Sequence, residues 1–516
     1  MAALSGSGMT VIEAPIGDQP IAIYPTPTAA FLGRAAAGPV NAPVVVDSVT
    51  AFDRVFGGEW SDNTLAEQVR LFFQHGGQRA IIVRLCNSAR CGELTLPADG
   101  VDLRLTTRHP GSAERVRASV DYDGIKDDRH FNLTLQRVDA SARHILDQEI
   151  YANLSIDAEA SLWFGHALAD SALVRLPAQP ALATRPLATR SQSAHGGVAY
   201  QSMSLLGDDG TALTDYDFVG SERTRTGLFA LDLAPDFDAL YACADTDDVA
   251  PGPTFVVAAT QYCASRNAML LVDPPPDDDA DAIVRWRHGG ALDSEHVLTY
   301  FPRLRRRDDA TASASSAAGA LMGLLLRHDA QHHVFTALAD SPSQNAALLH
   351  RDWLPSATLT TDDALTLLRV GVNPLVVGER RRLVFPALVT AANRRERRQG
   401  SLPDQRLKKF VLRQIERGTR WAVFRKRDET LWMQVADQVS TFMQSLAELG
   451  AFAEGRGNAQ SWSVRCDAET NAGVDGVRLL IGFRSVASDS PFMFAITQHS
   501  DGTTACRTAF TYPELA

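Results

Sequence analysis

Apolar and polar residues in the first hundred positions follow strand and helix periods in alternation. Continuous apolar runs favour buried strands, whereas apolar positions three or four residues apart favour amphipathic helices. Ser48 is a good N-cap residue, and the glycine pair at 57–58 ends the helix that follows it. The expected elements are a strand at 28–34, a short strand at 44–46, a helix at 49–56, a helix at 64–75 and a strand at 80–85. This order of strands and helices predicts an α/β layer.

The pattern changes after residue 92 and returns after residue 218. Strands of alternating polarity, such as 116–120 and 131–138, predominate between these points. A helix at 254–266 and a strand at 268–272 then resume the α/β pattern, so we expect the β-rich part to be an insertion. The predicted fold is α/β, of mixed α+β character, in several domains. The predicted division is an N-terminal arm (1–27), the first part of an α/β domain (28–92), an inserted β-rich domain (93–218), the second part of the α/β domain (219–375), a C-terminal core domain (376–489) and a C-terminal strand or arm (490–516).

Both ends of the chain are predicted to be extended arms. The first 27 residues are rich in Gly, Ser and Pro and contain only short β-like runs. Such a stretch cannot bury a core of its own and is expected to lie on another surface. The last twenty or so residues have a similar character.

Composition excludes some classes of protein. The chain has 516 residues, of which 45% are hydrophobic and 22% charged, and its apolar runs are far shorter than the roughly 18 residues that span a bilayer. The net charge of -11 argues against general nucleic-acid binding but allows a local basic patch. The N-terminus has neither a basic nor an apolar leader region, so we expect synthesis in the cytoplasm without a signal peptide. The six scattered cysteines are interpreted as reduced, mostly buried thiols.

Common catalytic and cofactor motifs are missing from the sequence. There is no Gly-Lys dipeptide and therefore no P-loop, and neither a Gly-x-Ser-x-Gly elbow nor a His-Glu-x-x-His pair occurs. The nearest approach to a metal site is His328, Asp329 and His332, because residues four apart share a helical face. A polar loop is the favoured interpretation, and a metal-dependent hydrolase is the alternative. No cofactor or catalytic residue is predicted.

Several motifs in a consistent order suggest a known family. The most specific block is C-terminal: Gly418-Thr-Arg-Trp-Ala-Val-Phe424, Leu431-Trp432, Gly450-Ala-Phe452 and Cys466-Asp467 followed by Glu469-Thr-Asn471. Further matches lie at 28–41, 52–58, 71–85, 131–135, 153–157 and 271–275. Together they resemble the tail-sheath protein family of contractile phage tails, tailocins and related injection systems. Two family segments are replaced here, by Ser315-Ser-Ala-Ala-Gly319 and Val384-Phe-Pro-Ala-Leu388, which leaves open a non-contracting or cap- or baseplate-proximal paralogue.

The resemblance implies a structural subunit rather than an enzyme. Such subunits form homo-hexameric rings that stack into a helical sheath around an inner tube, and the sheath contracts to drive the tube through a target envelope. The implied partners are other copies of the chain, the inner tube protein, and baseplate and terminator or cap proteins, with no nucleic acid and no membrane insertion. The implied location is the assembled particle, a virion tail or an injection system.

The resemblance also implies that neighbouring subunits exchange strands. Short apolar segments can add to the edge of another subunit's sheet, where main-chain hydrogen bonds supply affinity. Two runs near the chain ends have the composition for this exchange. The candidate residues are Thr10, Val11, Ile12, Glu13, Phe492, Met493, Phe494, Ala495 and Ile496.

A basic segment lies between Arg394 and Arg427. It contains thirteen Lys or Arg and three acids, a net charge of +10 within an acidic chain. This asymmetry predicts an acidic partner, for which the resemblance suggests the inner tube. Salt bridges between subunits, a solvated face and a nucleic-acid site are the alternatives. The candidate tube-contact residues are Arg406, Lys408, Lys409, Arg413, Arg417, Arg425, Lys426 and Arg427.

Overall fold

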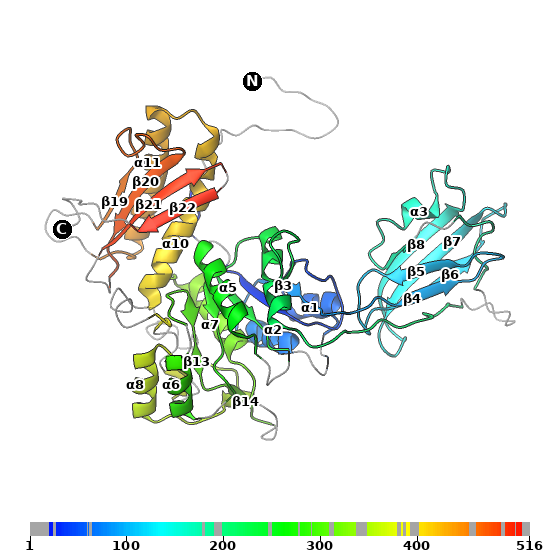
Figure 1. Cartoon of the computed structure of the whole chain (residues 1–516), viewed down its shortest axis with the longest axis horizontal. Helices are drawn as coiled ribbons and strands as arrows, with labels where there is room; N and C mark the ends of the chain where they lie inside the picture. Colours follow the sequence, from blue (N-terminus) through cyan, green and yellow to red (C-terminus); the bar gives the residue numbers. More distant parts are fainter. Residues whose placement is uncertain are drawn as a thin grey trace.

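A computed structural model gives the structure of the chain. It describes residues 20–507 except for 24–26, 59, 61–63, 178–180, 190–198, 246–249, 277–278, 290–291, 309–313, 337–347, 379–382, 385–388, 393–401, 454–460, 487–490 and 501. The predicted class is confirmed: the structure is a mixed α/β arrangement with several sheets (Figure 1).

The largest sheet has six strands in the order β12-β11-β10-β1-β3-β2. All neighbouring pairs are parallel except β2 and β3. The strands are β1 (Ala29–Gly33), β2 (Val44–Val46), β3 (Ala80–Arg84), β10 (Ala239–Ala242), β11 (Met269–Leu271) and β12 (Val297–Leu298). Because β1 lies between β3 and β10, this sheet is completed by strands from both sides of the β-rich region.

Helices cover both faces of the large sheet. Phe31 of β1 packs with Phe52 and Phe72 under α1 (Val49–Phe56), α2 (Thr64–Gln74) and α7 (Ala318–Gln331). Leu32, the next residue, joins a second cluster under α4 (Asp215–Val219), η1 (Gly227–Leu233) and α5 (Pro253–Ser265). Successive side chains of a strand point to opposite faces, so a strand buried on both faces is apolar throughout.

The local signals that predicted α1 are visible in its ends. The Ser48 hydroxyl accepts a hydrogen bond from the backbone N–H of Ala51 at 3.2 Å. Gly57 adopts φ 85°, a left-handed conformation that ends the helix and that glycine adopts without strain. The predicted helix boundaries are therefore confirmed at this element.

The β-rich region contains two three-stranded sheets. One joins β4 (Glu93–Leu96), β5 (Leu103–Thr107) and β9 (Val174–Arg175), and the other joins β6 (Arg115–Asp121), β7 (His130–Val138) and β8 (Ile145–Ser155). They enclose a core with Leu105, Phe131 and Phe164, the last from the short helix α3 (Phe164–Ala167). The region lies to one side of the α/β part, at the right of Figure 1.

Smaller elements extend the α/β part at its lower end in Figure 1. Helices α6 (Ala280–Gly289) and α8 (Thr361–Val370) pack around Ile283 and Leu367. Three two-stranded pairs accompany them: β13 (Tyr300–Phe301) with β16 (Asn373–Pro374), β14 (Leu304–Arg306) with β15 (Trp353–Pro355), and β17 (Val376–Val377) with β18 (Leu383–Val384).

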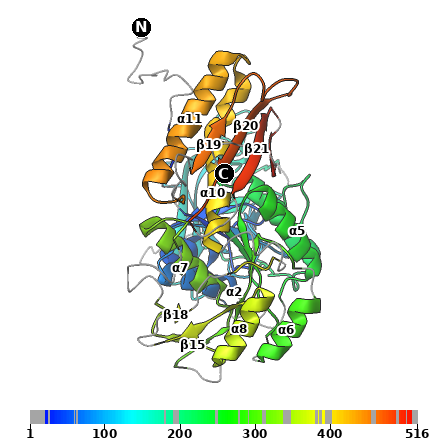
Figure 2. The same ribbon diagram turned by 90° about the vertical axis from the view of Figure 1, so that its left-hand side faces the viewer.

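The C-terminal part packs two helices and a short 3-10 helix against a four-stranded antiparallel sheet (Figure 2). The helices are α10 (Leu402–Thr419), η4 (Arg420–Phe424) and α11 (Glu429–Glu448). The strands, in spatial order, are β19 (Trp462–Arg465), β20 (Val477–Phe483), β21 (Phe492–His499) and β22 (Gly502–Arg507). Within the described part of the chain, no helix is long and apolar enough to cross a membrane.

The segment before β1 packs on this C-terminal part. Ile21 is buried in the same core as Phe442 and Ile481. Its Cγ1 lies only 2.5 Å from the position that a Cβ at Gly418 would occupy, so a glycine on α10 allows the segment to cross closely. The described chain thus starts on the C-terminal sheet domain and passes from there to β1.

Candidate assembly surfaces

Helix α10 is buried on two sides. One side, with Leu407, Val411 and Ile415, belongs to the C-terminal core. The other side carries basic residues that face the α/β part, and Figure 1 shows α10 between the two parts. Four of the candidate tube-contact residues are buried on this helix: Arg406, Lys408, Lys409 and Arg413.

Each of these four cations meets an acid of the same chain. Arg406 pairs with Asp329 of α7, and Arg413 pairs with Asp238 and donates to the carbonyl of Phe237 at 2.7 Å. Long charged side chains are seldom buried unless they are paired. The acidic partner that the net charge implied therefore lies, for these residues, within the chain itself.

The lysine pair of α10 shares one carboxylate. Lys408 Nζ lies 2.5 Å from Glu295 Oε1, and Lys409 Nζ lies 4.0 Å from the same oxygen. Burial by itself would raise the pKa of Glu295, but the two lysines outweigh it and hold that pKa below its ordinary value. Burial, with help from Lys408, lowers the pKa of Lys409 to about 7.

The other four candidates are exposed. Arg417 is half-exposed and lies 3.0 Å from Asp236, while Arg425, Lys426 and Arg427 form a loop between η4 and α11. Phe424, directly before this loop, is 83% exposed. We refer to residues 425–427 as the basic loop. Contact with a tube stays a prediction, and in this conformation the basic loop and Arg417 are the candidates that a partner can reach.

The strand-exchange candidates have different settings. Thr10, Val11, Ile12 and Glu13 lie outside the described residues. The run from Phe492 to Ile496 forms most of β21, which pairs with β20 on one side and β22 on the other. Phe492, Phe494 and Ile496 are buried in the domain core. The run is a central strand of the chain's own sheet in this conformation, and leaving that sheet would break both ladders.

The open edges of this sheet are β22 and β19, for which the described residues provide no second β-partner. Thr504 and Ala505 of β22 are exposed. The strand carries no charge before its last residue, whereas solitary edge strands are usually protected by charges or proline. The geometry therefore suits addition of a further strand at β22.

The histidine cluster does not form a metal site among the residues that the structure describes. His328 is fully buried at the end of α7, and its Nε2 lies 3.0 Å from the carbonyl oxygen of Thr336. Burial lowers the pKa of His328 to about 4, which keeps the ring neutral at pH 7. Asp329 is engaged by Arg406. This arrangement does not favour the metal-dependent hydrolase.

Comparisons of the sequence and of the structure give different results. No family model matches the sequence, and no curated protein matches it. Solved structures do match. A sheath tail protein from Listeria innocua is 15% identical, with a TM-score of 0.60 over 93% of this chain and 95% of the other. A sheath tail protein from Desulfitobacterium hafniense is 12% identical, with a TM-score of 0.54 over 98% and 100%.

Assembled sheaths also match. The contracted helical sheath of the anti-feeding prophage is 14% identical, with a TM-score of 0.52 over 94% of this chain and 97% of the other. The chain has the sheath-protein fold. The likeness extends over nearly the whole length of each chain, so the resemblance that the C-terminal motifs suggested is confirmed at the level of the fold.

In this sheath-protein fold, the sequence did not reveal which acids hold α10. Asp238, Glu295 and Asp329 are far from α10 in the chain and carry no common motif. The charge excess of the basic segment showed that acids were needed, but only the packing of α10 identifies them.

A buried arginine joins the β-rich region to the α/β part of the sheath-protein fold. Arg84, at the end of β3, donates to the carbonyl oxygens of Ala35 and Gly38 at 2.9 and 2.6 Å. Gly38 in turn donates its N–H to the Glu114 carboxylate at 2.7 Å, and Glu114 precedes β6 of the β-rich region. All of these groups are buried, so the connection is a packed polar network rather than a loose linker.

Proposed function

We propose that the chain is the structural subunit of a contractile sheath, in which rings of six copies stack into a helical array around an inner tube. The single observation that carries this proposal is the fold likeness over more than 90% of the chain to sheath subunits, two of them in contracted assemblies. In this role the chain performs no catalysis. Its contacts are heterologous, because one patch of a subunit meets a different patch of the next.

The position of the N-terminal segment supports strand exchange. The described chain begins on the C-terminal domain, where Ile21 is buried beside Gly418. We assign the run at 10–13 as the strand donor and the β22 edge of a neighbouring subunit as one acceptor. The run at 492–496 then contributes as the central strand of the acceptor sheet, since its pairing on both sides supports that edge.

Truncation tests this assignment. Removal of residues 1–19 leaves Ile21 and the C-terminal core intact, so the expected product is a folded monomer that no longer forms tubes in electron micrographs. Removal of residues 1–9 alone keeps the apolar run at 10–13 and serves as the matched control that still assembles. Tubes formed by the 1–19 deletion would contradict the strand-exchange account.

The basic loop is proposed as the inner-tube contact. Lys426 is 88% exposed, and Arg427 lies 3.0 Å from the exposed Asp475, so these charges are available at the surface. Reversal of charge at Arg425, Lys426 and Arg427 to Glu should leave the monomer folded and abolish co-assembly with an acidic tube protein. Reversal at Arg420, an exposed cation paired with Glu416, is the control. Unchanged co-assembly of the triple variant would reject this contact.

Contraction is proposed to proceed by rotation of subunits in an array that was trapped in an extended state at assembly, without nucleotide. Particles purified with tube and baseplate proteins should then occur in two lengths. A single length under all conditions would favour the non-contracting paralogue instead. The expected location is the assembled particle.

A further inference from the structure

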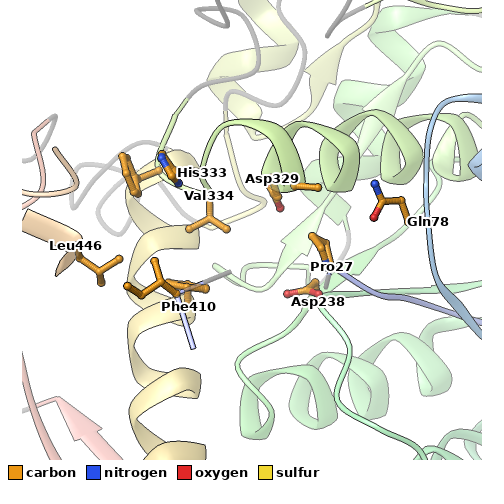
Figure 3. Close-up of a pocket in the computed structure, with 11 residues that line it drawn as sticks. Pro27, Gln78, Asp238, Asp329, His333, Val334, Phe410 and Leu446 are labelled. Carbon is orange, nitrogen blue, oxygen red and sulfur yellow. The ribbon is translucent and has the colours of Figure 1, made fainter. Parts of the chain in front are cut away.

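A cavity of about 190 Å³ lies where three parts of the chain meet (Figure 3). Its walls come from the N-terminal segment before β1, the C-terminal end of α7 with the residues after it, and the helices of the C-terminal domain. Ile23, Val334, Phe335, Phe410 and Leu446 make the lining largely apolar. Gln78 lines it too and is exposed, so the cavity reaches the surface there.

One polar group in the wall has an unmet hydrogen-bonding capacity. The Asp329 side chain is only 4% exposed, and Figure 3 shows its carboxylate directed toward the cavity. Its Oδ2 accepts from Arg406, whereas its Oδ1 is buried and has no partner among the described residues. A buried acceptor without a donor is costly, so a donor placed at Oδ1 would gain more than an ordinary exposed hydrogen bond.

The charges around the cavity decide what kind of donor fits. Asp329 is paired with Arg406, and Asp238, the other carboxylate of the wall, is paired with Arg413 and also accepts from the backbone N–H of Thr28 at 2.8 Å. His333 also lines the cavity, and burial lowers the pKa of its ring, so it adds no charge and the positive and negative groups balance. An ammonium ion would add an unpaired charge beside two guanidinium groups, and an anion would meet the Asp329 oxygen. A neutral O–H group introduces neither cost.

We propose that this cavity binds a small neutral molecule with an aromatic body and one hydroxyl donor, of the phenol class, whose O–H donates to Asp329 Oδ1. The size fits, because an apolar cavity of about 150 Å³ is sufficient to hold benzene. The ring would pack against Phe410 and Phe335, and aromatic pairs of this kind prefer offset or edge-on contacts. The proposed site goes beyond the proposed function and does not rest on it.

Binding is measured on the unassembled full-length chain by isothermal titration and thermal unfolding, with phenol as the probe. Phenol should bind saturably and raise the unfolding temperature, since a ligand that binds only the folded state stabilises it. Toluene has the same shape without the donor and should bind at least about tenfold more weakly, the factor that one hydrogen bond to a charged acceptor supplies. Benzylammonium should bind no better than toluene.

A variant that fills the cavity supplies the second comparison. Ala330 lines the cavity and is exposed on α7, so Ala330→Leu should fold normally and lose phenol binding. Ala264→Leu adds the same side chain to the exposed side of α5, away from the cavity lining, and should bind phenol as the unmodified chain does. Three results would each overturn the proposal: no saturable binding of phenol, equal binding of toluene, or unchanged binding by Ala330→Leu. If Ala330→Leu does not fold, the ratio of phenol to toluene affinity decides alone.

Discussion

Lys409 is the surplus cation of the α10 interface, and its replacement by methionine should stabilise the free chain at pH 7. Glu295 already holds Lys408 at 2.5 Å, while Lys409 lies 4.0 Å away, is 3% exposed and makes no hydrogen bond within the described structure. Burial lowers the pKa of Lys409 from 10.5 to about 7, which corresponds to about 5 kcal/mol at roughly 1.36 kcal/mol per unit. Replacing buried ionic groups by apolar side chains of similar volume is neutral or stabilising by up to about 4 kcal/mol when no charge is left without a partner, and Glu295 keeps Lys408 as its partner in this variant.

The sign of the pH dependence follows from the lowered pKa. Between about pH 7 and pH 10.5 the unfolded chain binds a proton at Lys409 that the folded chain does not, so this group opposes folding fully below pH 7 and less as the pH rises. The advantage of Lys409→Met over the unmodified chain should therefore shrink from pH 7 toward pH 10. Comparing the two proteins at each pH cancels the titration of the groups that do not interact with Lys409.

Urea denaturation followed by circular dichroism measures this difference, and Lys408→Met is the matched control. That variant removes the lysine that is properly paired with Glu295, so it should not stabilise the chain. The reasoning would be refuted if Lys409→Met lowered the midpoint at pH 7, or if its advantage over the unmodified chain did not depend on pH.

Three further outcomes are expected. Phe494→Ala, in the central strand β21, should destabilise the C-terminal domain by about 3–5 kcal/mol in urea denaturation, whereas Met433→Ala, at a residue that is 66% exposed, should leave that stability nearly unchanged. Equal effects of the two variants would contradict the buried position of β21. Thr504→Lys on the β22 edge should leave the monomer's stability unchanged but reduce tube formation in electron micrographs, while Thr504→Val should assemble; full assembly of the lysine variant would argue against this edge. Arg84→Met should lower the free energy of unfolding by about 3 kcal/mol and speed limited proteolysis between the β-rich region and the α/β part, because the carbonyl groups of Ala35 and Gly38 lose their donor. Unchanged cleavage would show that the network does not hold the two parts together.

The C-terminal basic segment shows where prediction from the sequence reached its limit. The structure places most of this segment on α10 and η4, and its excess of positive charge is a property of the sequence. The charge excess identified the need for acids but not their source, since an acid of the same chain and an acid of a tube protein satisfy a lysine equally well. Three of the eight candidate residues, Arg406, Lys408 and Arg413, are in fact hydrogen-bonded to Asp329, Glu295 and Asp238.

The run at 492–496 shows the same limit for strands. An apolar run bounded by short polar segments is compatible with two structures: an arm that joins a neighbouring sheet, and a central strand of the chain's own sheet. In either structure the strand buries one face and exposes the other, so the sequence pattern is the same. The register with β20 and β22 distinguishes them, and it depends on residues as far along the chain as Leu479, which is 17 positions from its partner Ile496.

The sequence by itself determined the local elements and their class. Ser48 and Gly57 bound α1 through hydrogen bonds and dihedral angles that involve only nearby residues, and the periodicity of 64–75 and 254–266 identified α2 and α5. Its motifs also pointed to the fold that the solved structures share. The tertiary structure alone decided which charges are buried, which strand edges are open and where the cavity beside Asp329 lies. Those features arise from contacts between residues distant in the chain, and such contacts leave no periodic signal in the order of the amino acids.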